Sequence, residues 1–320
     1  MAITLAEAKA LSQDKLTQFV IDEFRKSALL DLLPFDNTVK PQGGESMTYS
    51  YNRVTTLPTA AGRALGSEYT PQETKTTKYN TELKVFGGSF QLDRVIIKHE
   101  TQVVDHVDFQ MLQKIKATTA KFHDLFVNGD SATTPTDFDG LDKALTGSNT
   151  ELNAAGTAID LSTGSAIDSN WKVFLDYMRS LRAKLDGAPS VWLMNSEMYA
   201  RFQSVMDRAG INLASKANYG DEATQWGSAL VMALGDKPGT SNPIIPIGTD
   251  TNAGLTSIYV ARLALDGVHG ISPDGNDVVT SYLPNMNAPG AVKTGEVEMV
   301  AAIALKATRA AGVLRKLKVA

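Results

Sequence analysis

The sequence predicts an α+β fold in which a mixed α/β block is joined to unusually extended segments. Three observations predict it. Two strand-like runs, residues 47–54 and 79–97, flank about 20 polar residues; one helix pattern continues through 100–127 without Pro or Gly; and helix and strand patterns alternate from residue 171 onward. With 320 residues the chain is long enough for two domains.

Composition excludes several functional classes. There are 31 Lys and Arg against 35 Asp and Glu, a net charge of −4, whereas proteins that grip nucleic acid are usually basic. The absence of cysteine excludes disulfides, thiolate catalysis and cysteine-ligated metals. No apolar run reaches the roughly 20 residues that span a bilayer. The first seven residues lack a basic stretch and include Glu7, so we expect synthesis in the cytoplasm.

The N-terminal segment, 1–45, is predicted to be an apolar arm. Phe19 and Phe24 lie on one stripe of a helix pattern, and Leu29 and Leu32 belong to a leucine-rich run that follows it. Terminal segments fray unless they are held by a partner surface. We therefore expect these four side chains to be buried against the chain's own body or against a neighbouring subunit.

Residues 46–97 are predicted to form a long hairpin that projects from the body. Gly87-Gly88 predicts a bend or bulge in its second strand. A two-stranded hairpin is marginally stable alone, so it should lie on another copy of the chain. The charged residues predicted to make contacts across that boundary are Arg53, Arg63, Glu68, Glu73, Lys75 and Lys78. The alternative is an ordinary solvated loop.

A long amphipathic helix and an α/β block follow the hairpin. Residues 100–127 would form a rod of roughly 40 Å, which Asn128-Gly129 ends. Next come a helix at 171–185, a buried strand at 191–194 and a helix capped by Asn195 or Ser196. Further strands are expected at 229–234, 244–247, 257–265, 296–306 and 312–319.

No motif predicts a catalytic, cofactor-binding or metal-binding residue. His99 and His106 are seven residues apart, so on a helix their rings would be about 10 Å apart and could not share a zinc ion. Ser12 and Lys15 match a short nucleophile motif whose partner motifs are absent as a set, and no phosphate-binding glycine loop occurs. An unrelated α/β enzyme therefore stays a weak alternative without a candidate set of residues.

The order of elements resembles the major capsid proteins of tailed bacteriophages, which have the Hong Kong 97-type (HK97-like) fold. The order is apolar arm, long hairpin, long helix, α/β block and closing strands; the closing segment 295–317 also resembles those of actinobacterial phage capsids. The resemblance implies an N-arm at 1–45 and an E-loop hairpin at 46–97. It implies a P-domain with a long spine helix, at 98–137 and 277–320, and an α/β A-domain at 138–276.

The resemblance also implies a function. Such a chain would be a structural protein, not an enzyme, that self-assembles as hexamers and pentamers into an icosahedral shell enclosing double-stranded DNA. It would need no cofactor, would not bind DNA by sequence or enter a membrane, and would be located in the virion. Scaffold, portal and decoration proteins would be candidate partners. The alternative is an encapsulin, a nanocompartment shell protein of the same fold.

Overall fold

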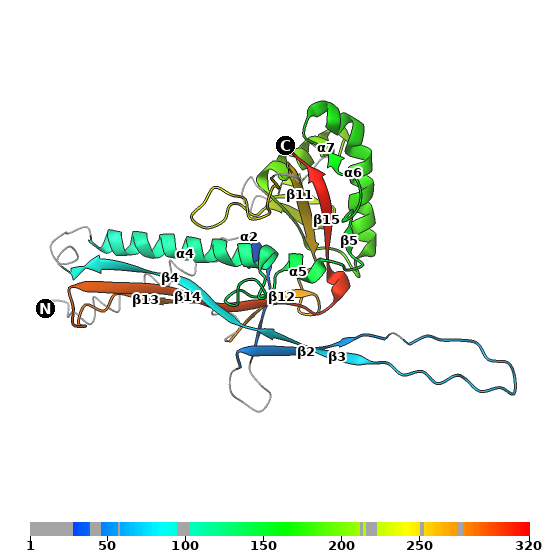
Figure 1. The fold of residues 1–320 in the computed structure, drawn as a ribbon, viewed down its shortest axis with the longest axis horizontal. Coiled ribbons are helices and arrows are strands. Elements are labelled where there is room, and N and C mark those ends of the chain that lie inside the picture. The colour runs from blue at the N-terminus through cyan, green and yellow to red at the C-terminus, as the bar shows by residue number, and fades with distance from the viewer. Residues whose placement is uncertain are drawn as a thin grey trace.

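The computed structural model describes residues 28–38, 46–56, 58–94, 103–211, 214–215, 223–249, 253–273 and 278–320. These residues form an elongated layer of helix on sheet, an upright α/β lobe and a hairpin that projects from their junction (Figure 1). The predicted α+β class is confirmed: both helices and strands are present, in two large sheets and a separate two-stranded ribbon.

The elongated layer is a five-stranded sheet covered on one face by α4 (Val103–Asn128). Its strands, in spatial order, are β1 (Phe35–Asn37), β12 (Val268–Ser272), β14 (Val292–Leu305) and β13 (Val279–Tyr282), with β4 (Lys84–Asp93) pairing along β14. The 26 residues of α4 extend about 39 Å. Met111 and Ile115 of α4 bury Phe90 and Val297 of the sheet between them, which holds helix and sheet together.

The upright lobe is built on an eight-stranded sheet. The strands are β5 (Glu151–Leu152), β6 (Ile159–Asp160), β7 (Val191–Met194), β8 (Ala214–Ser215), β9 (Ala223–Trp226), β10 (Ala229–Ala233), β11 (Leu255–Ala261) and β15 (Ala311–Lys318). Two helices, α6 (Gly164–Lys184) and α7 (Ser196–Arg208), cover one face of the sheet. Every residue of β7 is buried, as its wholly apolar sequence predicts.

Three local predictions differ from the structure. The helix predicted from residue 171 begins at Gly164, because the Thr163 side chain accepts a hydrogen bond from the backbone N–H of Ala166 and caps it. No strand forms at 244–247; Ile244 and Ile245 are buried as loop residues. Gly87 pairs regularly with Glu298, which excludes the bulge among the two predicted alternatives, bend or bulge. The predicted cap Asn195 is confirmed, since its side chain accepts from the N–H of Met198 at 2.8 Å.

The last strands of the chain do not all belong to one sheet. β12, which precedes residue 277, pairs with β14 in the five-stranded sheet, while β15 pairs with β11 in the eight-stranded sheet. The predicted division at 276 and 277 therefore does not coincide with the division between the sheets. The strand pairing explains why: the chain crosses between the layers twice, once before β12 and once through the turn η3 (Thr308–Ala310) after β14.

The projecting ribbon consists of β2 (Thr48–Val54) and β3 (Thr76–Glu82). They pair from Thr48 with Glu82 to Val54 with Thr76. A short helix, α2 (Ala28–Leu32), and β1 lie just before them in the chain. α5 (Leu141–Leu145) lies at the junction of the layers.

Candidate subunit interface

The hairpin leaves the body between β2 and β3 and continues far beyond the paired strands (Figure 1). Residues 58–75 are all exposed. The backbone bonds that join the two legs beyond the ribbon are near its base, from Thr55 and Thr56 to the carbonyl of Lys75. This part of the hairpin has no core of its own, as the sequence predicts.

Apart from Arg53, the predicted charged residues of the hairpin are free of ion pairs in the described structure. Arg63, Glu68, Glu73, Lys75 and Lys78 are exposed, and none forms an ion pair within those parts of the chain. Arg63 bends the tip locally, because its guanidinium donates to the Ser67 carbonyl at 3.1 Å and lies 5.4 Å from the centre of the Tyr69 ring. Leu65 at the tip is fully exposed. Contact of these residues with another copy stays a prediction.

Arg53 is at the hairpin base, where it binds its own subunit. Its Nε donates to the Lys306 carbonyl at 3.0 Å, and a terminal nitrogen donates to the Leu305 carbonyl. The guanidinium also lies 4.3 Å from the centre of the Tyr79 ring on the opposite strand. Arg53 is therefore an anchor that fixes where the hairpin leaves the body, a role for which sequence spacing offers no signal.

Two tyrosines of β2 complete the anchor. The Tyr51 hydroxyl donates to the Leu305 carbonyl at 3.0 Å, and the Tyr49 hydroxyl donates to Asp36 at 2.6 Å. Burial, followed by the hydrogen bond with Asp36, raises the pKa of Tyr49 well above its usual value. The edge of the Tyr49 ring also meets His269, whose side chain is fully buried. The projecting ribbon thus has a rigid, polar attachment to β12 and β14.

The arm residues predicted for the same interface have different positions. Leu29 is only 1% exposed and packs into the main core with Leu33 and Phe122, while Leu32 is half-buried against that core. Leu29 therefore meets the chain's own body, one of the two surfaces expected for it, and a contact of the arm with a neighbouring subunit stays a prediction. Phe19 and Phe24 lie outside the described residues.

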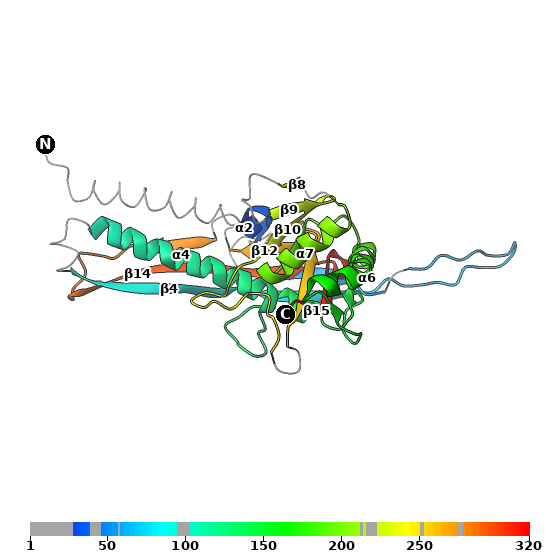
Figure 2. The same ribbon diagram turned by 90° about the horizontal axis from the view of Figure 1, so that it is seen from above.

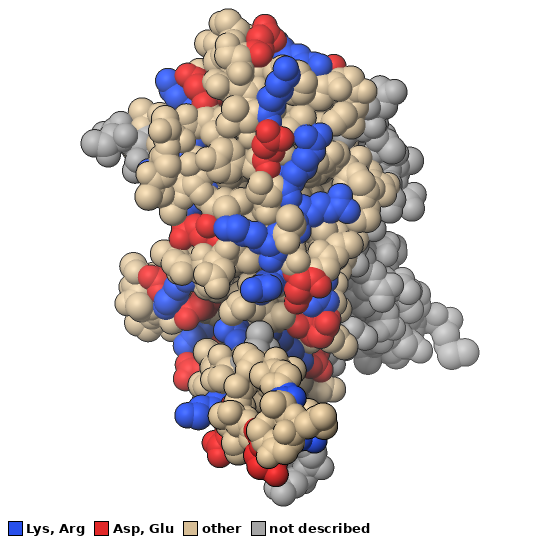
Figure 3. All heavy atoms as spheres, turned by 90° about the vertical axis from the view of Figure 1, so that its right-hand side faces the viewer, with Lys and Arg blue, Asp and Glu red and all other residues tan. Residues whose placement is uncertain are grey.

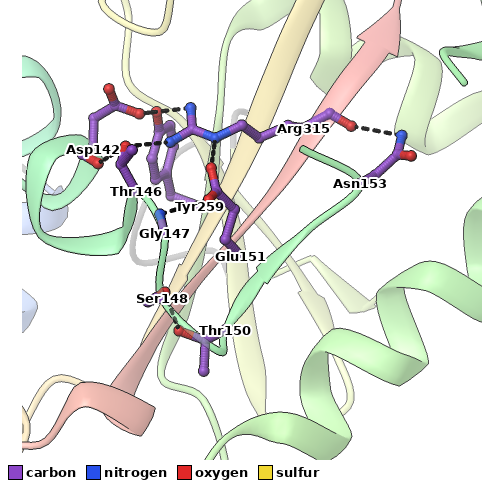
Figure 4. Close-up of polar contacts among 9 residues, drawn as sticks. All are labelled: Asp142, Thr146, Gly147, Ser148, Thr150, Glu151, Asn153, Tyr259 and Arg315. Atoms are coloured by element: carbon purple, nitrogen blue, oxygen red, sulfur yellow. Dashed lines mark hydrogen bonds and ion pairs between the residues drawn. The ribbon is translucent and has the colours of Figure 1, made fainter. Parts of the chain in front are cut away.

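A partly exposed polar cluster joins α5 to the upright lobe (Figure 4). The Arg315 guanidinium on β15 donates to Asp142 at 2.7 Å, to Thr146 at 3.0 Å and to Glu151. Tyr259 donates to the same Asp142 carboxylate at 2.7 Å. Burial opposes the charge of Arg315, but its bonds to Glu151 and Asp142 outweigh it and raise the pKa. The cluster holds the lobe in place relative to the layer that carries the hairpin.

The surface beside the hairpin is polar and richer in basic than acidic side chains. Viewed with the hairpin pointing at the reader, this face has a column of Lys and Arg above the hairpin (Figure 3). The exposed basic residues of α6 and η3 are Lys172, Arg179, Arg182, Lys184 and Arg309. Arg179 pairs with Asp176 at 3.5 Å. Such a face suits polar contacts with another protein surface more than burial in a permanent apolar core.

A cleft of about 590 Å³ lies between the hairpin base and α5. Its Lys143 pairs with Asp130 at 2.6 Å and with Asp139 at 2.8 Å. Hydrogen bonds from Lys143, the Thr133 hydroxyl and the Ala132 N–H lower the pKa of Asp130 to about 2, so it is a poor general base. Within the described ranges, no three His, Asp or Glu residues are arranged to hold a metal ion.

The same ranges contain no helix that is both long and apolar enough to span a membrane. His99 lies outside the described residues, as do Ser12 and Lys15. The predicted absence of an active site stays a prediction.

No family model matches the sequence, and no curated protein does. Solved structures match nearly the whole chain. The holo-SrpI encapsulin complex from Synechococcus elongatus PCC 7942 aligns with a TM-score of 0.59 and 15% identity, over 91% of this chain and 87% of that chain. Gordonia phage Cozz aligns with a TM-score of 0.57 and 13% identity, over 92% and 86%.

The capsid of the native GTA particle aligns with a TM-score of 0.56 and 12% identity, over 91% of this chain and 90% of that one. At such identities the likeness shows the fold alone. The chain therefore has the fold that phage capsids and encapsulins share, and the predicted Hong Kong 97-type fold is confirmed.

Proposed function

We propose that this chain is a structural shell protein whose copies assemble through the projecting hairpin. The observation that carries the proposal is the hairpin itself. Residues 58–75 are all exposed, bury no side chain against the parts of the chain that the structure describes, and extend from the anchor at Arg53. The fold shared with capsids and encapsulins supports the same conclusion. Because each copy both extends a hairpin and receives one, association is multivalent and can be stable although each contact is modest.

A hairpin truncation tests this proposal. Residues 57–73 are replaced by Asn-Gly, a turn that closes two-stranded ribbons and leaves β2, β3 and β4 intact. The control keeps the full length but replaces residues 59–62 by a Gly-Ser repeat. We expect closed particles from the unmodified chain and the control, by negative-stain microscopy and sedimentation velocity. The truncated chain should stay small with an unchanged circular dichroism spectrum; intact shells from it would refute the proposal.

We further propose that the shell is the major capsid of a tailed bacteriophage, built of hexamers and pentamers around double-stranded DNA. The phage-like closing segment and the alignment with Gordonia phage Cozz support this reading. In this reading the protein is made in the bacterial cytoplasm, ends in the virion, and has scaffold, portal or decoration proteins as candidate partners.

The encapsulin alternative is supported by the alignment with the SrpI complex, whose TM-score is at least as high. Particles recovered from the native source separate the two functions. Nuclease-resistant double-stranded DNA, together with both pentamers and hexamers in micrographs, would favour the capsid. A single co-purifying enzyme without DNA would favour the encapsulin.

A further inference from the structure

His269 of β12 is buried at the point where the hairpin base lies against the body. Its side chain is inaccessible to solvent, and within the described residues neither ring nitrogen has a hydrogen-bond partner. The Tyr49 ring of β2 meets it edge-on, with 5.7 Å between the ring centres. Buried polar groups are almost always paired, so two unpaired ring nitrogens call for a functional explanation.

Titratable groups from every segment packed around this ring face it. They are Asp36 of β1, Tyr49 of β2, Asp266 in the turn before β12 and Lys306 after β14. The Asp36 carboxylate accepts from the Tyr49 hydroxyl at 2.6 Å and lies 3.8 Å from the Lys306 ammonium. The Asp266 carboxylate pairs with Arg262 at 2.8 Å. Both carboxylates are thus engaged before the ring gains a proton.

These surroundings keep the ring of His269 neutral at pH 7. Burial, followed by the charge of Lys306, lowers its pKa from 6.5 to about 4; the two carboxylates and the nearby Gly267 backbone favour the proton without outweighing them. When β2 lifts away, water reaches the ring and the pKa returns to about 6.5. The lifted form binds the proton more tightly than the closed form, so a lower pH favours it. Between pH 8 and pH 5 the ratio of lifted to closed form should rise about 30-fold.

A proton on His269 also acts directly on the Tyr49 contact. The imidazolium lies near the ammonium of Lys306, which repels it. Both oxygens of Asp36 are occupied, one by the Tyr49 hydroxyl and the other by the Asn37 N–H at 3.0 Å, so an imidazolium competes for them. Hydration of the ring requires that the Tyr49 side chain moves away. Each route loosens the attachment of β2.

The other bonds of the hairpin base do not titrate between pH 5 and pH 8. The Tyr51 hydroxyl and the Arg53 guanidinium donate to the backbone carbonyls of Leu305 and Lys306, which accept at any pH. Tyr49 precedes both residues in β2, so this end of the strand can detach while the rest stays bound. Figure 2 shows the hairpin extending from this base in line with the layer and past the lobe, so a small rotation at the base displaces its far end strongly.

We propose that His269 is a pH-sensitive switch of the hairpin base: protonation of its ring releases Tyr49 and lets the hairpin turn about the bonds of Tyr51 and Arg53. The layer and the lobe stay folded in this step, because their cores contain no fully buried residue of β2. The switch is a property of one subunit. It goes beyond the proposed shell function and does not depend on whether copies assemble.

Thiol reactivity measures how often the base opens, since the natural chain has no cysteine. Ala304 is buried and pairs with His269 across the sheet, so both side chains lie on the face that β2 covers. Unassembled full-length subunits carrying Ala304→Cys are reacted with a pyridyl disulfide, and Ser180→Cys on exposed α6 gives the unprotected rate at each pH. The protection of Ala304→Cys should fall about 30-fold between pH 8 and pH 5, and should not change when His269→Gln is added. If Ala304→Cys misfolds, Ala302→Cys on the same face replaces it.

A cysteine in the lobe separates local opening from unfolding. Ala229→Cys is buried in the core of the lobe, so only unfolding exposes it, and its protection should exceed that of Ala304→Cys at both pH values. Equal protection at the two positions would mean that β2 opens only with the whole subunit, which would overturn the proposal. A fall of less than about threefold in the natural background, or the same fall with His269→Gln, would overturn it as well.

Two phenylalanine variants test the competition for Asp36. Tyr49→Phe keeps the ring that covers His269 but frees Asp36 to pair with the imidazolium in the closed form. The fall in protection between pH 8 and pH 5 should therefore shrink to less than about tenfold. Tyr51→Phe loses a bond to a backbone carbonyl and should keep the 30-fold change. An undiminished change in both variants would overturn the part assigned to Tyr49 and Asp36.

Discussion

Residues 28–38 belong to the arm that was expected to be buried against the chain's own body or a neighbouring subunit, and residues 58–75 belong to the hairpin that was expected to lie on another copy. The structure places these two segments in different environments. The first segment is bound to its own body: Leu29 and Leu33 are buried in the main core, and β1 pairs with β12. The second is exposed throughout, and beyond its base its hydrogen bonds within the described residues join only residues of the hairpin itself, as between Thr59 and Gln72. Only the hairpin segment leaves the body of the subunit.

The difference follows from their side chains. Residues 28–33 include four leucines, and an apolar side chain is stabilised by the first apolar surface that it can reach, here the end of α4. Residues 58–75 contain Leu65 and Tyr69 among threonines, alanines and charges, so little is gained by folding back. The apolar side chains of residues 28–33 are therefore buried in the chain's own core. The polar residues 58–75 stay exposed and are available to contact another copy.

The test with the largest expected effect replaces one leucine in each of the two segments. Leu29→Ala should lower the free energy of unfolding of the isolated subunit by about 2–5 kcal/mol, because it leaves a cavity in the core. Leu65→Ala should change it by less than about 0.5 kcal/mol. Urea unfolding followed by fluorescence measures both. Equal effects would mean that the two segments do not differ in the way that the structure describes.

Much of the layered fold could be predicted from periodicity alone. The buried strand at 191–194, the cap Asn195 and the long helix ending at Asn128 all have local signals, and each is where the sequence places it. The start of α6 was missed because residues 164–170 are mostly polar or small and exposed, and only Ile167 among them is buried. The exchange of β12 and β15 between sheets was missed because pairing partners far apart in the chain leave no local pattern.

The candidate interface was predictable in outline and not in its attachment. Exposure of Arg63, Glu68, Glu73, Lys75 and Lys78 follows from a polar segment without a core. The role of Arg53 does not, because its acceptors are the backbone carbonyls of Leu305 and Lys306, about 250 residues away, and a carbonyl has no sequence signature.

His269, which lies where the hairpin base meets β1 and β12, should make the free energy of unfolding depend on pH. His269 is buried between β1, β2 and the end of β14, and is faced by Asp36, Tyr49 and Lys306, with Asp266 nearby. Burial, and then the charge of Lys306, lowers its pKa from 6.5 to about 4. Between these values the unfolded chain binds more protons, so stability present above pH 6.5 is lost as the pH falls to about 4.

The variant His269→Gln isolates the contribution of His269 to the pH dependence of the unfolding free energy. His269→Gln cannot gain a proton in that range, so its loss of unfolding free energy between pH 7 and pH 4 should be smaller than the natural chain's by roughly 2–3 kcal/mol. His123, whose pKa burial also lowers to about 4, is unchanged in the variant and provides a common background. Identical pH profiles of the two proteins, measured by thermal unfolding in buffers of equal ionic strength, would contradict this account of the junction.

The smallest expected effect separates the base of the hairpin from its tip. Arg53→Lys keeps the charge but loses the planar fork that reaches two carbonyls and lies over Tyr79, so the isolated subunit should lose about 1 kcal/mol and the amides of β2 should exchange faster. Arg63→Lys makes the same change at the tip, where the guanidinium bonds only within its own turn, and should leave both quantities unaltered. Because the base fixes the direction in which the hairpin projects, Arg53→Lys should also reduce the yield of particles although residue 53 would touch no neighbour. A normal yield together with faster exchange at the base would mean that the receiving subunit, and not the anchor, orients the hairpin.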